Sequence, residues 1–214
     1  MEIMGFAAGP FQTNCYIWSN EGRCVIVDPG MHAHERVVET IDEGGWDVEA
    51  ILLTHGHIDH TRDAGSLAAR YNVPVYIHPD DEFMLDKGAG VSAETRQLFD
   101  AENMTPIADL RSLNHADTVS MAGVDFEVRH APGHSPGCVL LVNTHSHVCF
   151  AGDVLFKGSI GRTDLEFSKH SDMLTSLREQ VLTLDDQLHV LPGHGPATTI
   201  RAERTNNPFL LQLR

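Results

Sequence analysis

Short apolar runs recur along the chain and alternate with amphipathic stretches. Nine runs have the length and composition of β-strands, at residues 2–7, 15–19, 24–27, 50–53, 75–78, 125–130, 139–143, 147–151 and 188–191. The tetrapeptide Asn20-Glu21-Gly22-Arg23 separates two of them and predicts a hairpin turn. Strands this numerous predict that a large part of the chain is sheet.

Helical spacing appears between the strand-like runs. Three stretches place apolar residues on one helix face: Val37, Val38 and Ile41; Ala64, Leu67, Ala68 and Tyr71; and Leu174, Leu177, Val181 and Leu184. Gly44-Gly45 ends the first, and Ser171 is the expected N-cap of the third. Residues 80–114 are more polar and irregular, and predict a helical excursion over the mouth of a binding site. Strands interleaved with helices predict one layered α/β domain over residues 1–214.

Composition narrows the class of protein. The formal net charge of −15 argues against a nucleic-acid partner, because phosphate binding favours a basic surface. No apolar run approaches the roughly 20 residues of a membrane helix, so no membrane partner is expected. The four cysteines form no CxxC pair and are expected to be free thiols, while residues 1–12 lack the basic segment of a signal peptide. A cytoplasmic location is the expectation.

The segment Leu53-Thr54-His55-Gly56-His57-Ile58-Asp59-His60 places four potential metal ligands within six residues. Three further loops carry the same kinds of side chain: Gly133-His134-Ser135-Pro136, Gly152-Asp153 and Pro192-Gly193-His194-Gly195. Each of the four segments follows an apolar strand. Loops at strand ends converge along one edge of a sheet, so these side chains are expected to form one site.

The ligand types indicate a metal and a reaction. Imidazole and carboxylate without thiolate suit zinc, which is expected first, or iron or manganese. A structural zinc site closes with four ligands, often cysteines, whereas this set holds five histidines and two aspartates. Seven ligands predict two adjacent open ions that share one carboxylate. Two metals about 3.5–4 Å apart clamp an oxygen nucleophile and lower its pKa toward about 7, which is typical of hydrolysis.

The order His55-Gly-His57-Ile-Asp59-His60, His134, Asp153, His194 resembles the metallo-β-lactamase fold superfamily, and the likeness extends from Val27-Asp28-Pro29-Gly30 to Pro196. The resemblance implies a four-layer αββα sandwich with two divalent metals at one edge. It also implies that one metal is held by His55, His57 and His134, the other by Asp59, His60 and His194, with Asp153 bridging. Asp28 and Thr54 match positions that often support the ligands, although a purely structural role is equally open.

The stretch Gly152-Asp153-Val154-Leu155-Phe156, continuing to Gly161-Arg162-Thr163-Asp164, resembles glyoxalase II, in its short, single-domain hydroxyacylglutathione hydrolase form. That resemblance implies hydrolysis of S-lactoylglutathione, a thioester, by a hydroxide that bridges the metals, with Asp59 and Asp153 as catalytic residues. The resemblance is to the short form, so no counterpart of the helical domain of the longer enzymes is expected within residues 1–214, and Asp164 stands where those enzymes present a tyrosine. Arg162 is therefore expected either to bind a substrate carboxylate or to pair with Asp164.

Related activities remain as alternatives. A persulfide dioxygenase would use one iron held by His55, His134 and Asp153, and a lactonase would use all seven ligands. A β-lactamase is disfavoured because Asp153 replaces a cysteine common among its zinc enzymes. The substrate expected from the sequence is a small thioester or ester, with a glutathione conjugate among the candidates.

Overall fold

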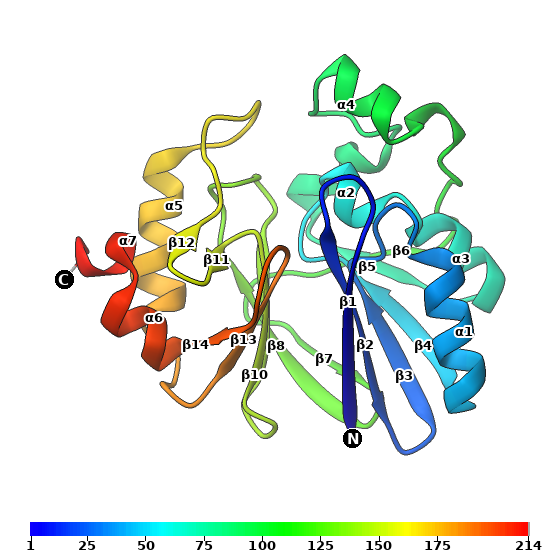
Figure 1. Ribbon diagram of the computed structural model, residues 1–214, viewed down its shortest axis with the longest axis horizontal. Coiled ribbons are helices and arrows are strands. Elements are labelled where there is room, and N and C mark those ends of the chain that lie inside the picture. The colour runs from blue at the N-terminus through cyan, green and yellow to red at the C-terminus, as the bar shows by residue number, and fades with distance from the viewer. Residues whose placement is uncertain (214) are drawn as a thin grey trace.

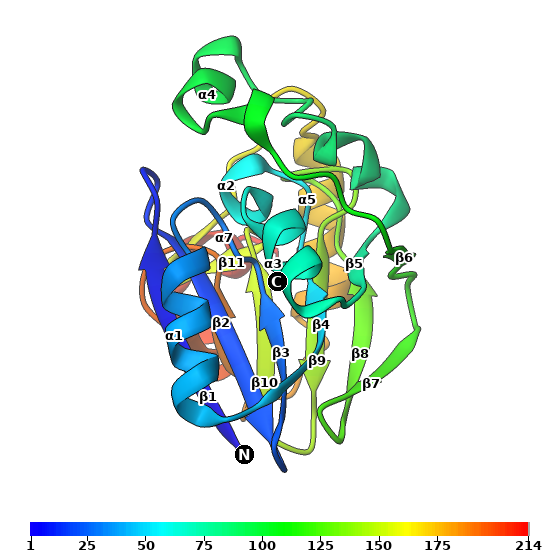
Figure 2. The same ribbon diagram turned by 90° about the vertical axis from the view of Figure 1, so that its right-hand side faces the viewer.

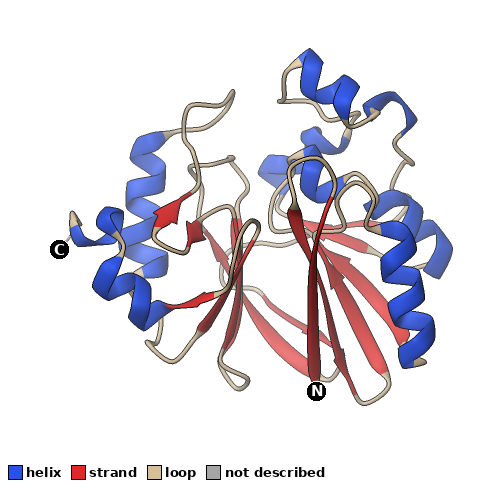
Figure 3. Cartoon of the chain, viewed as in Figure 1, coloured by secondary structure: helices blue, strands red, loops and turns tan. Residues whose placement is uncertain are grey.

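The chain folds into two six-stranded sheets that pack face to face, with helices on both outer sides, in a computed structural model that describes residues 1–213 (Figures 1 and 3). The first sheet has the order β1-β2-β3-β4-β5-β6, with bounds Glu2–Ala8, Thr13–Asn20, Arg23–Val27, Asp47–Leu52, Val75–Ile77 and Leu110–Ser112. The second has the order β14-β13-β10-β9-β8-β7, with bounds Thr198–Thr199, His189–Pro192, Val148–Gly152, Val139–Asn143, Val124–His130 and Thr118–Met121. A small hairpin joins β11 (Leu155–Phe156) to β12 (Ser159–Ile160). The predicted αββα sandwich is confirmed.

Helices cover the two outer faces. On the first sheet lie α1 (His34–Gly44) and α3 (Ala64–Tyr71), and on the second lie α5 (His170–Ser176), α6 (Ile200–Asn206) and α7 (Pro208–Leu211) (Figure 1). A π-helical turn, Leu177–Val181, continues α5. The predicted cap at Ser171 is wrong: the N-cap is Lys169, two residues earlier, so α5 begins at His170, and the cap makes no side-chain hydrogen bond. Among the described residues, no helix is long and apolar enough to cross a membrane.

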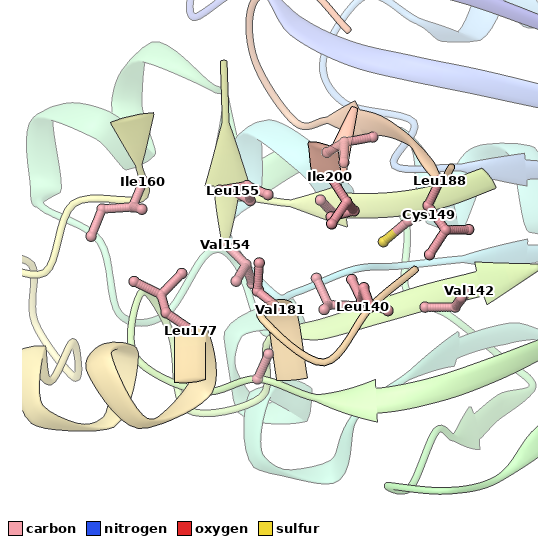
Figure 4. Packing of buried hydrophobic residues seen from close by; sticks show 14 of the residues in the cluster. Leu140, Val142, Cys149, Val154, Leu155, Ile160, Leu177, Val181, Leu188 and Ile200 are labelled. Carbon is pink, nitrogen blue, oxygen red and sulfur yellow. The ribbon is translucent and has the colours of Figure 1, made fainter. Parts of the chain in front are cut away.

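Side-chain alternation explains the four layers. In β2, Cys15 and Ile17 face the helices, while Tyr16 and Trp18 face the other sheet. In β9, Leu140 and Val142 pack toward α5, as Figure 4 shows from close by. Because both faces of each sheet are covered, the strands read as continuous apolar runs rather than as alternating ones. Burial of each such side chain contributes about 1.5–3 kcal/mol, which makes the sandwich a firm support for its loops.

The polar stretch after β5 rises above the sheets, as the two views of Figures 1 and 2 agree. It contains the 3-10 helix η1 (Pro79–Leu85), α4 (Ala93–Leu98) and a second 3-10 turn, η2 (Ala101–Asn103). The predicted helical excursion is confirmed. The predicted hairpin is confirmed too, because β2 and β3 pair antiparallel with Asn20 opposite Arg23.

Candidate metal centre

The four ligand segments meet at one edge of the sandwich. His55 and His57 lie in the loop after β4, and the short helix α2 (Ile58–Thr61) begins directly after His57 and carries Asp59 and His60. His134 follows β8, Asp153 comes directly after β10, and His194 comes two residues after the end of β13. Figure 1 shows α2 at the upper end of the first sheet. The structure thus brings together all seven side chains expected from the sequence.

Three histidines form one half of the site. His57 Nδ1 lies 2.9 Å from His134 Nε2, and the His55 ring stands edge-on to both neighbours, with centroids 4.9 and 5.0 Å away. Each ring offers a nitrogen within 4.8 Å of the others. This spacing suits a single ion held by three imidazoles.

Asp59, His60 and His194 form the other half. Asp59 Oδ2 lies 3.3 Å from His194 Nε2 and 3.5 Å from His60 Nε2, and the two imidazole nitrogens are 3.4 Å apart. Asp153 lies between the halves, with Oδ2 at 3.4 Å from His134 Nε2 and at 3.5 Å from His194 Nε2, and Oδ1 at 3.4 Å from His60 Nε2. One carboxylate therefore faces ligands of both halves.

Buried atoms without partners test whether metals fit. Within residues 1–213, His55 Nε2, His57 Nε2 and Asp153 Oδ1 are buried and have no hydrogen-bond partner. An unsatisfied buried polar group costs about 1–3 kcal/mol, so three such acceptor atoms in one place fit the coordination of cations. A convergent set of imidazole and carboxylate donors without thiolate fits divalent zinc, iron or manganese.

The charge states of His55, His57 and Asp59 also suit cation binding. Burial lowers the pKa of His55 well below its usual value, and burial with the neighbouring His134 lowers the pKa of His57 to about 3. Both rings are therefore neutral and keep a lone pair. Burial alone would raise the pKa of Asp59, but His60 and His194 outweigh it and lower that pKa. Metal binding requires neutral imidazoles and ionised carboxylates of this kind.

Asp28 orients His60, one of the expected ligands. It is buried, and its Oδ1 accepts a hydrogen bond from the Thr54 backbone N–H (2.8 Å). Its Oδ2 accepts one from Thr54 Oγ1 (2.6 Å) and lies 3.0 Å from His60 Nδ1. When His60 Nδ1 carries the proton, Nε2 is left free to face the site. The structure thus places Asp28 and Thr54 in direct support of the ligand loop.

Asp81 in η1 is a further supporting residue, which the sequence did not reveal. It is fully buried, and its carboxylate accepts hydrogen bonds from Gly56 N (2.8 Å), Gly137 N (2.6 Å) and Ser135 Oγ (2.5 Å). It therefore ties the loop of His55 and His57 to the loop of His134. A side chain at Gly137 would place its Cβ 2.7 Å from the Asp81 carboxyl carbon, so the contact requires glycine.

Two other contacts were also not visible in the sequence. Thr13 Oγ1 donates a hydrogen bond to Asp59 Oδ2 (2.9 Å) from the start of β2. Gly193 packs so closely that a Cβ there would lie 2.2 Å from Asp153 Oδ1. Both contacts join segments far apart in sequence, and no local pattern marks them.

A cleft of about 850 Å³ opens onto the ligands. Its walls come from the β1–β2 loop, the segment before α4 and the loop after β12, with apolar side chains from Phe11, Val91, Phe156, Ile160 and Leu165. This volume suits a small organic ligand.

Arg162 lines the cleft and pairs with Asp164. Its Nε donates a hydrogen bond to Oδ1 (2.7 Å) and its Nη2 donates one to Oδ2 (2.9 Å). Of the two roles expected for Arg162, the structure shows the ion pair.

A group outside the cleft also combines histidine and aspartate. His78, Asp80 and His130 offer ligand atoms within 4.8 Å of one another. However, the two rings stack with centroids 3.9 Å apart and an interplanar angle of 7°, so their in-plane lone pairs do not converge. His78 Nδ1 already accepts the Asp80 backbone N–H, and His130 Nε2 lies 2.8 Å from the Pro136 carbonyl oxygen. We assign no metal to this group.

Known proteins resemble the chain over nearly its whole length. It is 41% identical to the uncharacterized protein ML0493 of Mycobacterium leprae, covering 98% of this chain and 99% of that protein. It is 36% identical to the hydroxyacylglutathione hydrolase GloC of Haemophilus influenzae, covering 94% and 93%.

Two crystal structures superpose closely. The BLEG-1 B3 metallo-beta-lactamase gives a TM-score of 0.87 at 35% identity, covering 98% of this chain and 99% of that one. TTHA1623 in a di-iron-bound form gives 0.85 at 35% identity, covering 97% and 100%. The profile of the metallo-beta-lactamase superfamily matches residues 8–195. With this match and the ligand geometry, the chain belongs to the metallo-beta-lactamase superfamily.

Proposed function

We propose that the chain is a dinuclear metal-dependent hydrolase that cleaves a small thioester of the S-lactoylglutathione type. The observation that carries the proposal is the position of Asp153, whose two oxygens face ligands of both halves of the site. His55, His57 and His134 would hold one ion, and Asp59, His60 and His194 the other, with Asp153 shared. Two such ions supply a hydroxide nucleophile near neutral pH and polarise a carbonyl oxygen.

The chain's own residues prepare the site for this chemistry. Asp28 and Asp81 fix the ligand loops, and apolar side chains of the cleft offer a surface for the substrate beside the expected ligands. A thiol leaving group has a pKa of about 8.5 and departs as thiolate, so no strongly tuned general acid is required. The relative named hydroxyacylglutathione hydrolase supports a thioester substrate.

The test is turnover of S-lactoylglutathione by metal-loaded protein, followed by release of lactate. Chelated protein should be inactive and should recover when zinc, iron or manganese is restored. Activity that persists after removal of metal would contradict the proposal.

β-lactam hydrolysis is the second candidate, because the BLEG-1 structure shares 35% identity over nearly the full chain. The sequence disfavoured it on the ground that Asp153 replaces a cysteine. A chromogenic cephalosporin assayed beside the thioester separates the two activities.

The mononuclear persulfide dioxygenase is less well supported. It would leave Asp59, His60 and His194 without a role, although their ligand atoms lie within 4.8 Å of one another. Oxygen uptake on glutathione persulfide, with one iron per chain, would favour that enzyme over a hydrolase.

A further inference from the structure

The charge at the mouth of the cleft bears on which thioester is accepted. Apart from the expected metal ligands, its charged lining residues are Arg162, Asp164 and Glu166, all exposed and all in the loop after β12. Among residues 1–213, Arg162 is the single Lys or Arg that lines the cleft. One cation and two carboxylates leave the mouth with a net negative charge.

The loop is anchored beside the metal ligands, so its side chains lie close to any bound substrate. The Arg162 carbonyl oxygen lies 2.9 Å from His134 Nδ1, and Gly161 packs against the Asp153 backbone. The main chain of Arg162 thus contacts a ligand while its guanidinium extends to Asp164.

Asp164 occupies one of the two edges of Arg162 that can bind a carboxylate through paired N–H donors, and its charge offsets that of the guanidinium. Bidentate recognition of a carboxylate requires two parallel N–H donors, and Asp164 takes Nε and Nη2. Besides this pair and Glu166, the wall holds apolar residues such as Phe11, Val91 and Leu165 and the uncharged polar residues Ser92, Thr95 and Ser159, but no second Lys or Arg among residues 1–213.

We propose that Asp164 is a specificity-determining residue: it masks Arg162, so that the cleft selects thioesters with an uncharged outer portion over carboxylate-bearing ones. This inference rests on the proposed thioesterase activity and narrows its substrate. A glutathione conjugate carries two carboxylates, and it should therefore be a weaker substrate than a neutral thioester with the same acyl group.

The test compares S-lactoylglutathione with S-lactoyl-N-acetylcysteamine, which share the reacting thioester and differ in charge. Ions at the base of the cleft would act on the same carbonyl in both thioesters. The ratio of the kcat/KM values of the two thioesters therefore reports on interactions at the mouth. We expect the wild type to favour the neutral thioester. Asp164→Asn should raise the glutathione-to-neutral ratio about two- to fivefold, the range of an exposed ion pair. The gain should shrink at high salt and disappear in the double variant R162Q/D164N.

A matched control lies elsewhere on the surface. Asp109 forms a bidentate pair with Arg111, also two residues away and also exposed, and neither residue lines the cleft. Asp109→Asn should leave the ratio unchanged. An equal change in both variants would assign the effect to overall charge and overturn the proposal.

Binding of S-hexylglutathione, a thioether that cannot be hydrolysed, gives a second readout by calorimetry. Its Kd should fall about two- to fivefold in Asp164→Asn. A wild type that prefers S-lactoylglutathione, with no change on substitution, would overturn the inference alone. If neither thioester is hydrolysed, the proposed function fails, and an unchanged Kd would then refute the role of Asp164 as well.

Discussion

The base and the mouth of the cleft use carboxylates in opposite ways. Behind the expected ligands at the base, Asp81 is fully buried and accepts hydrogen bonds from two ligand loops. At the mouth, Asp164 is exposed and pairs with a residue two positions away. A buried carboxylate without its partners is costly, so Asp81 fixes geometry, whereas an exposed pair contributes little to stability and is free to adjust recognition. Substitutions should therefore have effects that decrease from base to mouth.

The largest effect is expected from removing a ligand. His57→Ala or Asp59→Ala should lower kcat/KM at least about a hundredfold, more than the loss of a residue that only orients a ligand. Both side chains lie at the loop edge of the sandwich, so circular dichroism should show an intact fold. Full activity in either variant would refute the ligand assignment.

Asp28→Asn should weaken metal binding indirectly, through the expected ligand His60. Its loss removes the contact that orients His60, and metal affinity should fall about 10- to 100-fold. Competition with a chromogenic chelator measures the change. Unaltered affinity would mean that Asp28 serves only the turn before α1.

Asp81→Asn should weaken the fold as well as the site. An amide cannot accept all three hydrogen bonds, so the free energy of unfolding should fall by about 1–3 kcal/mol. At roughly 3 °C per kcal/mol, thermal denaturation of the metal-free protein would detect this loss. Asp80→Asn is the control, because Asp80 precedes Asp81 in the chain and its own side chain is 58% exposed. Equal melting temperatures in the wild type, Asp81→Asn and Asp80→Asn would contradict the role given to Asp81.

The smallest effect on stability is expected at the mouth. Asp164→Asn should change the free energy of unfolding by less than about 0.5 kcal/mol, as usual for surface substitutions. Chemical denaturation of wild type and variant measures the difference. If Asp164→Asn lowered the free energy of unfolding as much as Asp81→Asn, the proposed difference between the base and the mouth would be wrong.

The sequence predicts site residues that one short segment carries better than residues that only the fold brings together. His55, His57, Asp59 and His60 are visible because one short segment carries them. The apolar runs predict most strands and a layered α/β domain, whereas the four-layer sandwich was implied by the family resemblance. Short strands such as β6, β7 and β11 were not predicted, since two to four residues carry no clear alternation.

Long-range contacts account for most of what was missed. Asp81 looks like one more acidic residue in a polar stretch, and only the fold brings it to Gly56 and Gly137. The sequence also left open whether Arg162 binds substrate or pairs with Asp164, because a spacing of two residues permits both. The N-cap expected at Ser171 was wrong because capping is a weak local preference that tertiary packing overrides.

We propose that two neighbouring cations are held jointly by these loops. Metal-free protein can be titrated with zinc, iron or manganese, followed by elemental analysis and an assay of thioester turnover. We expect two ions per chain and full activity only when both are bound. Full activity with one ion, or with none, would contradict it.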